Sequence, residues 1–150
     1  MDIFDQLVGT IEAPAKPRRF VFVLLEEFTM LCFSAAVESL RIANRMSGRD
    51  LYTWVLMSES GAPVRCSAGI EFVVQHELID VSRDDTVMIC GGVNIKTASS
   101  KKIVNWLRRE SRRGPLMAGL CTAGYTLAKA GLLDGKRADR PYKKHGNIPL

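Results

Sequence analysis

The feature that most constrains the fold is the apolar run RFVFVLL, residues 19–25. After its first residue, every side chain is β-branched, aromatic or leucine, with no polar alternation. Such a run is typical of a strand that is buried on both faces, as in a parallel sheet. A second run, TVMIC at residues 86–90, stops at Gly91-Gly92. Together the two runs predict core strands with helices packed on both sides.

Helical patterns lie between the strand-like runs. Apolar residues recur at helical spacing in residues 30–46, before a stop at Ser47-Gly48. Residues 99–114 read as a second helix, capped by Ser99 or Ser100 and ended by Gly114. The other predicted elements are strands at 51–58 and 115–120, a hairpin at 63–74, and a helix at 122–130 closed by Gly131. Strands alternating with helices predict an α/β domain with a mostly parallel sheet.

The first predicted helix carries a second apolar stripe. Leu31, Ala35, Ile42 and Met46 form it, beside the main stripe that begins at Met30. A helix that is apolar on two sides is either sandwiched within the domain or buried against another subunit. The sequence leaves both alternatives open.

Three features follow predicted strands directly: the Glu26–Thr29 turn, Gly91-Gly92 and Cys121. Open parallel sheets bind ligands at the carboxyl ends of their strands. We therefore expect these features to share one edge of the sheet. Glycine amides there can face an anion or a carbonyl oxygen, although a plain tight turn needs the same residues.

Cys121 lies in GLCTAGYTLAKAGLLDG, between a short strand and a helix, among small residues that suit a sharp turn. The field of a helix N-terminus favours a thiolate there. Nucleophilic catalysis also needs a proton-transfer partner, and the two histidines, His76 and His145, are distant in sequence. The local sequence therefore favours a structural or ligand-contacting thiol over a catalytic one.

Composition excludes several classes of function. The four cysteines include no C-x-x-C pair and there are only two histidines, so we predict no metal site. We also expect no cofactor. No apolar run reaches the roughly 20 residues that span a membrane, and residues 1–20 lack the core of a secretory signal. These features predict a cytoplasmic protein without a membrane partner.

The net charge of +5 is unevenly distributed. The last fifteen residues, KRADRPYKKHGNIPL, hold five bases and one acid and supply +4 of it. The basic residues of the 99–114 helix complement its dipole and are predicted to form a solvated face; they are Lys101, Lys102, Arg108, Arg109, Arg112 and Arg113. The charge pattern does not indicate that the folded body binds nucleic acid.

Three stretches together resemble a known family: FVLLEEFTMLCFSAAVESLRIANRMSGR, VMICGGVN and GLCTAGYTLAKAGLLDGKR. They are similar to the N-terminal PfpI/ThiJ-like (class I glutamine amidotransferase-like) domain of GlxA-type regulators in the AraC/XylS family. The resemblance implies a flavodoxin-like α/β sandwich, here with its C-terminal part incomplete, that senses a small-molecule effector and forms a homodimer. DNA would be bound only through a helix-turn-helix region outside this chain.

The resemblance also implies a class of effector. Several members respond to amines or amino-acid derivatives, including carnitine and glycine betaine, and we expect regulation of the catabolism of such compounds. An aromatic cage would be the physical signature of such a ligand. Phe28, Trp54 and Tyr125 are the aromatic residues that we expect to take part.

Aligned by eye with enzymes of the superfamily, Cys121 matches the nucleophile. Thr29 stands where those enzymes have a glutamate, and Thr122 stands where many have a histidine. The resemblance therefore implies no catalytic residue and no enzyme, with Cys121 the only candidate nucleophile. The predicted ligand-binding residues are Phe28, Thr29, Gly91, Gly92, Cys121 and Thr122. The alternative is a cysteine-dependent hydrolase, amidotransferase or glyoxalase-like enzyme.

We expect three segments along the chain: a leader at 1–18, a partial ligand-sensing domain at 19–137, and an atypical basic tail at 138–150. The resemblance implies further residues after 137 in full-length relatives, so we expect a fragment, a truncation or a frameshift product. A truncated chain that pairs with intact relatives is a further alternative.

Overall fold

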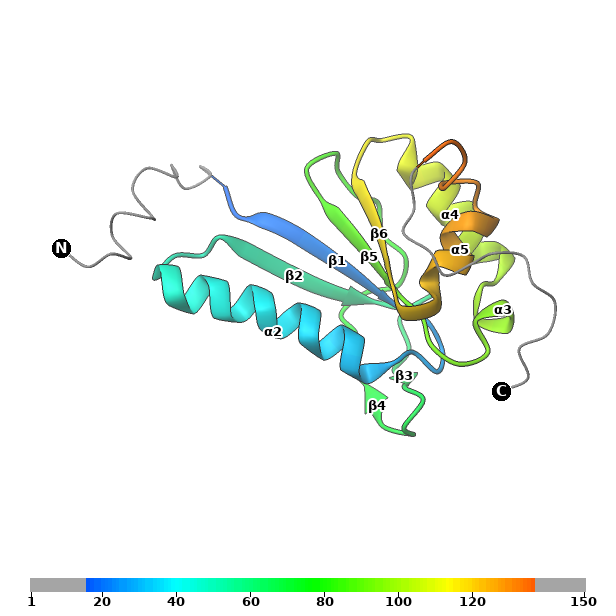
Figure 1. Cartoon of the computed structure of the whole chain (residues 1–150), viewed down its shortest axis with the longest axis horizontal. Helices are drawn as coiled ribbons and strands as arrows, with labels where there is room; N and C mark the ends of the chain where they lie inside the picture. Colours follow the sequence, from blue (N-terminus) through cyan, green and yellow to red (C-terminus); the bar gives the residue numbers. More distant parts are fainter. Residues whose placement is uncertain (1–15, 137–150) are drawn as a thin grey trace.

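The computed structural model of the chain describes residues 16–136, which form a sheet between helices (Figure 1). Four parallel strands make the sheet in the order β2-β1-β5-β6. Their bounds are β1 Arg18–Leu24, β2 Tyr52–Met57, β5 Thr86–Cys90 and β6 Leu116–Leu120. The predicted α/β class with a parallel sheet is confirmed.

The central position of β1 explains why its sequence is apolar throughout. Val21 pairs in register with Val55 of β2 on one side and with Val87 of β5 on the other. Val21 and Val23 belong to one buried cluster, whereas Phe22 and Leu24 belong to the cluster on the opposite face. Alternate residues of a strand face opposite ways, so a strand covered on both sides needs apolar residues at every position.

One face of the sheet is covered by α2, Met30–Ser47. Phe33 is buried against Phe22 with the rings edge to face, 5.5 Å between centroids. Gly48 ends the helix in the left-handed region, at φ 63°. The helix therefore matches its predicted bounds and its main apolar stripe.

The second apolar stripe of α2 faces away from the sheet. Leu31 and Met46 are each 76% exposed and Ile42 is 47% exposed. The alternative in which this helix is sandwiched therefore does not hold among residues 16–136, and the stripe forms an apolar outer surface.

The other face is covered by α3 Ile95–Ala98, α4 Lys101–Ser111 and α5 Gly124–Lys129. A 3₁₀ turn, Cys121–Ala123, comes before α5. Ser100 caps α4, because its hydroxyl accepts a hydrogen bond from the Ile103 amide at 3.1 Å. The helix α3 was not predicted from the sequence. The prediction of a continuous helix from residue 122 was wrong in its first turn, because α5 begins at Gly124 after the 3₁₀ turn.

The predicted hairpin is present but short. It pairs β3, Val64–Arg65, with β4, Glu71–Phe72, in antiparallel register. Gly69 lies in the connecting turn at φ 81°, a conformation that favours glycine. The hairpin brings the Phe72 ring edge to face with those of Phe28 and Phe33, at 5.1 and 5.8 Å.

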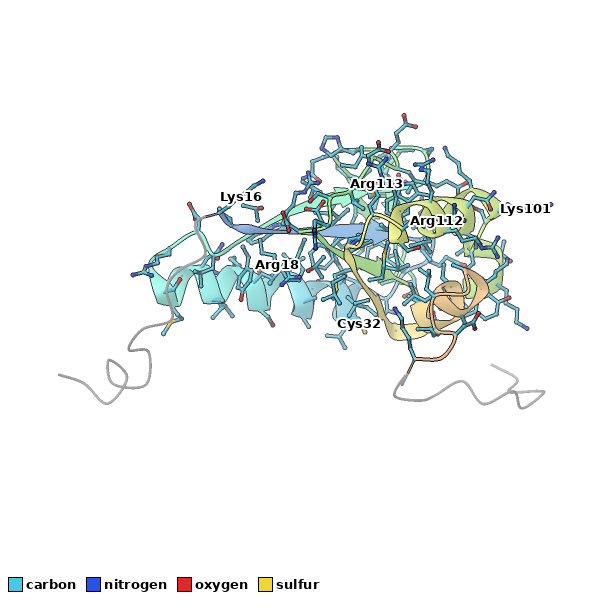
Figure 2. The ribbon with its side chains drawn as sticks, turned by 90° about the horizontal axis from the view of Figure 1, so that it is seen from above. Lys16, Arg18, Cys32, Lys101, Arg112 and Arg113 are labelled. Carbon is cyan, nitrogen blue, oxygen red and sulfur yellow. The ribbon has the colours of Figure 1, made fainter. Side chains whose placement is uncertain are left out.

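Basic side chains of α4 and the residues just after it form ion pairs and hydrogen bonds with the rest of the domain. Arg109 and Arg113 both pair with Glu110 and with Asp80, and Arg108 donates to the Ala130 and Lys129 carbonyls. Figure 2 shows Lys101 at the start of α4, and Arg112 and Arg113 just beyond its last residue. Much of this charge is therefore paired within the protein.

Several predictions fall on residues outside 16–136, including almost all of the leader, the basic tail at 138–150 and His145. Arg18, placed in the predicted leader, is the first residue of β1. Within the described part of the chain, no helix is long and apolar enough to cross a membrane. The same residues contain no cluster of three or more side chains suited to a metal ion.

Candidate functional site

The three predicted features meet at the carboxyl edge of the sheet, at the ends of β1, β5 and β6. The Thr29 amide donates to the Gly91 carbonyl at 3.0 Å, and the Thr122 hydroxyl donates to the Gly92 carbonyl at 2.7 Å. The Val93 amide donates to the Glu27 carbonyl at 3.1 Å. These bonds connect the three loops, so the edge is one site built from distant parts of the sequence.

Gly91 and Gly92 are required by how closely the loops approach. A Cβ atom on Gly92 would clash with the Glu27 carbonyl oxygen and lie 2.7 Å from the Thr29 nitrogen. A Cβ atom on Gly91 would lie 2.7 Å from the Ala123 nitrogen and 2.9 Å from Thr122 Oγ1. The Gly91 amide already donates to the Leu120 carbonyl at 3.3 Å. The close packing therefore explains both glycines, and the Gly91 amide is not free to bind an anion.

Cys121 lies at a sharp turn between β6 and the 3₁₀ turn. Its φ of 56° is in the left-handed region, which is unusual for a residue other than glycine. The side chain is exposed, with Sγ 3.3 Å from Oγ1 of Thr29. Although Thr29 is the N-cap residue of α2, its hydroxyl makes no capping bond and points to the thiol instead. The elbow geometry is present, and the thiol pairs with a hydroxyl group.

Two further cysteines lie near this thiol. Burial raises the pKa of Cys32, and a hydrogen-bonding and electrostatic interaction with Cys121 raises it further. Burial, with a smaller contribution from Cys32, raises the pKa of Cys90 to about 12. Cys32 and Cys90 are therefore protonated at neutral pH. Cys32 was not predicted as a site residue, although its position three residues after Thr29 places it on the same side of α2.

No described histidine lies beside Cys121. His76 is exposed and bridges to Met57, at the end of β2. The elbow follows β6, and β2 and β6 are the two outer strands of the sheet. Three strand spacings of about 4.8 Å separate them. His76 therefore cannot transfer a proton to or from the Cys121 thiol in this arrangement.

The predicted aromatic residues do not gather into a cage. Phe28 is 0% exposed, and its ring packs against Phe33 and Phe72. Trp54 packs against the same cluster, whereas Tyr125 packs against the cluster on the opposite face of the sheet. The prediction of an aromatic cage is wrong, because the three side chains pack in two separate clusters on opposite faces of the sheet.

A cleft of about 360 Å³ lies at the same edge of the sheet, beyond β1 and β2. Its lining includes Glu26, Ser58, Glu59 and Lys102. The Glu59 carboxylate accepts a hydrogen bond from Ser100 at 2.8 Å, and Lys102 donates to the Glu59 carbonyl at 2.8 Å. The cleft is distinct from the Cys121 elbow, which has its own exposed surface.

A comparison with protein families matches the DJ-1/PfpI family over residues 18–139. That span includes all four strands and every residue of the elbow. The chain belongs to the DJ-1/PfpI family. The turn at Cys121, where φ is 56°, and the glycines at the strand ends therefore lie within the region that matches the family.

The curated relatives are regulators of transcription. The chain is 38% identical over 119 residues to the HTH-type transcriptional regulator GbdR of Pseudomonas aeruginosa, covering 79% of this chain and 32% of that protein. It is 32% identical over 120 residues to the HTH-type transcriptional regulator GlxA of Rhizobium meliloti, covering 79% of this chain and 37% of that protein. The chain thus spans about a third of the length of these relatives.

Solved structures show the same fold. An AraC family transcriptional regulator from Pseudomonas putida superposes with a TM-score of 0.69 at 27% identity, covering 80% of this chain and 64% of that one. The flavodoxin-like α/β fold and the similarity to AraC-type regulators of the GlxA group are confirmed.

Proposed function

We propose that this DJ-1/PfpI domain is the effector-sensing part of an AraC-type transcriptional regulator. The observation that carries the proposal is the partner of Cys121: a threonine hydroxyl lies 3.3 Å from the thiol. A hydroxyl group is neither a general base nor an acid at neutral pH, so this pair lacks the proton transfer that nucleophilic catalysis needs. The similarity to GbdR and GlxA supports the same conclusion.

The proposed effector binds on the rim formed by Thr29, Gly91, Gly92, Cys121 and Thr122. Thr29 and Thr122 are half-buried and Cys121 is exposed, so these three can offer polar groups to a small ligand. Phe28 is fully buried and supports the rim through its backbone and its aromatic cluster. We propose an amine or amino-acid derivative as the ligand class, on the family resemblance. The site of action is proposed to be the cytoplasm.

Thermal-shift screening tests the effector proposal. The full chain is heated with a panel of quaternary ammonium compounds, including glycine betaine and carnitine, and with free amino acids. A binding compound raises Tm, because a ligand selective for the native state stabilises it. Thr29→Val removes one rim hydroxyl and should reduce that shift, whereas Thr53→Val, at an exposed position of β2, should preserve it. A panel that leaves Tm unchanged contradicts the proposal.

The competing function is an enzyme that uses Cys121 as nucleophile. The specific observation in its favour is the exposed thiol at φ 56°, a strained turn of the kind that presents nucleophiles. Methylglyoxal-consumption and peptidase assays on wild type and Cys121→Ala separate the two functions. Turnover that disappears in Cys121→Ala would replace the sensor proposal with the enzyme.

We also propose that the chain forms a homodimer through the outer stripe of α2. Leu31 and Met46 are each 76% exposed there, and exposed apolar side chains in a row are typical of an interface. Effector binding would then alter how two copies, and any DNA reader attached to them, are arranged. The proposal predicts DNA binding only through a helix-turn-helix region.

Light scattering after size exclusion tests the dimer. Wild type should elute with the mass of two chains, and the double substitution Leu31→Glu and Met46→Glu should give one. Lys101→Glu, on the far side of the sheet, is the matched control and should leave the mass unchanged. A monomeric wild type contradicts the proposal.

A further inference from the structure

Three of the four cysteines gather at the carboxyl edge of the sheet. Cys121 is exposed at the elbow, Cys32 is half-buried in the first turn of α2, and Cys90 is buried at the end of β5. The fourth, Cys66, is buried beside the hairpin. The proposed sensor function uses Cys121 as a rim residue but gives Cys32 and Cys90 no role.

One pair in this group, Cys32 and Cys121, lies at the elbow. Thr29 Oγ1 lies 3.3 Å from Cys121 Sγ, and Cys32 follows Thr29 by one turn of α2, so both side chains lie on the side that faces the elbow. The Cys121 thiol lies near enough to Cys32 to raise the pKa of the Cys32 thiol, beyond the effect of burial. Figure 2 shows Cys32 beside the end of β6, from which Cys121 continues. No side chain needs to cross the sheet to bring the two sulfur atoms together.

We propose that Cys32 and Cys121 are a thiol modification site that closes into a reversible intrachain disulfide. The co-reactant is a low-molecular-weight disulfide, such as oxidised glutathione. The link joins the start of α2 to the elbow, which lie far apart in the sequence. This inference is independent of which effector the domain senses.

The reaction takes place in two exchange steps. Cys121 Sγ, as thiolate, attacks one sulfur of the small disulfide, forms a mixed disulfide, and releases one small thiol that carries the proton lost from Cys121. Cys32 Sγ then attacks the Cys121 sulfur of the mixed disulfide and releases the second small thiol with the Cys32 proton. Both cysteines are oxidised, and the one small disulfide is reduced to two thiols.

Exposure decides which thiol reacts first. A small disulfide can reach Cys121 from solvent, whereas Cys32 is half-buried and its raised pKa keeps it protonated. Cys32 acts only when the mixed disulfide is already beside it. Cys90 is 1% exposed with a pKa of about 12, so it takes no part in either step.

The test exposes the full chain to oxidised glutathione at neutral pH and follows it by intact mass and by peptide mapping without reductant. Wild type should lose two hydrogens, yield a linked peptide pair containing Cys32 and Cys121, and return to its starting mass with dithiothreitol. Cys32→Ser should stop at a single glutathione adduct on Cys121. Cys121→Ser should remain unmodified at Cys32, and Cys66→Ala should behave as wild type.

Two results would overturn the proposal. One is a wild-type chain that accumulates the glutathione adduct on Cys121 as stably as Cys32→Ser does. The other is a link that joins Cys121 to Cys90 or Cys66. Circular dichroism confirms that each variant is folded, and because peptide mapping of wild type needs no substitution, it decides the outcome even where a variant does not fold.

Discussion

At the scale of single residues, the most consequential side chain outside the site is Glu110. It is 0% exposed, yet it carries a carboxylate. Arg109 Nε lies 2.7 Å from one of its oxygens, and Arg113 Nε lies 3.0 Å from the other. The Val81 amide also donates to this carboxylate at 3.1 Å. A buried charge persists only when it is paired and hydrogen-bonded in this way.

We predict that Glu110→Ala lowers the free energy of unfolding by about 3 kcal/mol, because it leaves a cavity and an unsatisfied buried amide. Arg109→Ala should lower it by less than about 1 kcal/mol, because that side chain is 59% exposed and its pairing is weakened by solvent. Urea denaturation of both variants measures the difference. Equal losses would contradict the role given to Glu110.

A second residue-scale prediction concerns Asp85, which receives hydrogen bonds from Arg19 at 2.6 and 2.9 Å and from the Ser82 amide at 2.7 Å. Burial alone would raise the pKa of Asp85, but these hydrogen bonds and the Arg19 charge outweigh it and hold the pKa below its ordinary value. The unfolded carboxyl titrates near pH ~4, so the contribution is complete above that pH and is lost as pH falls through the lower folded pKa.

Asp85→Asn should therefore lower stability at pH 7 and make the loss of stability below about pH 4 shallower. Unfolding free energies measured from pH 2 to pH 7 check this. The exposed neighbour Asp84 supplies the control, because Asp84→Asn should retain the wild-type acid dependence. If the unfolding free energy of Asp85→Asn falls below about pH 4 as steeply as that of wild type, the ionisation of this carboxylate does not contribute to stability.

The elbow was predictable from sequence because small residues, a strand before and a helix after are local signals. Glu110 was not predicted, since a charged residue on a helix is usually read as solvent-facing. Its spacing held a signal: Ile103, Leu107 and Glu110 follow the i, i+4, i+7 rule of one helix face. Cys32 was missed for another reason, because its relation to Cys121 exists only in three dimensions.

At the scale of elements, α4 depends on its N-terminal cap. Ser100 accepts a hydrogen bond from the Ile103 amide at 3.1 Å and donates to Glu59 at 2.8 Å. Without such a cap, the first amides of a helix have no partner. The same residue thus starts the helix and connects it to the cleft.

We predict that Ser100→Ala lowers the unfolding free energy by about 1 kcal/mol, the usual cost of losing an N-cap. Ser111→Ala, at the other end of the same helix, should cost only a few tenths of that amount. Thermal or urea unfolding of the two variants gives the comparison. A larger effect for Ser111→Ala would show that the Ser100 cap is not what stabilises the N-terminal end of α4.

Long elements with a clear period were predictable, and short ones were not. The eighteen residues of α2 supply several turns of apolar spacing, and its Gly48 stop is a strong local signal. The four residues of α3 and the three of the 3₁₀ turn are too short for a period to appear. The tertiary hydrogen bonds around Gly91 and Gly92, not local propensity, determine where these short pieces lie.

At the scale of the whole molecule, two buried clusters share β1. Val21 and Val23 belong to the cluster under α4, and Phe22 and Leu24 belong to the cluster under α2. Each cluster contains one tryptophan: Trp106 in the first, Trp54 in the second. A strand common to both clusters couples their unfolding.

We therefore predict a single cooperative transition. The single-tryptophan variants Trp54→Phe and Trp106→Phe should each show one fluorescence transition in urea, coincident with the transition that circular dichroism reports for the same variant. Each fluorescence signal reports a different face of the sheet. Transitions that separate between fluorescence and circular dichroism would show that the faces unfold independently.

The parallel sheet and its two covered faces were predictable, because uninterrupted apolar strands can be satisfied only in that way. The exposed outer stripe of α2 was visible in the sequence as a pattern, but the choice between internal and external burial was not. That choice depends on whether another helix or subunit covers the outer side of α2. The apolar spacing within one helix does not contain this information.

The backbone angle of Cys121 has a consequence for how freely this position can vary. At φ 56°, glycine, asparagine and aspartate fit more easily than cysteine does. In a library randomised at residue 121, sorting for folded protein alone should enrich those three residues. Sorting for effector response should instead retain cysteine, so the difference between the two enriched pools would measure how strongly function opposes folding at a single codon.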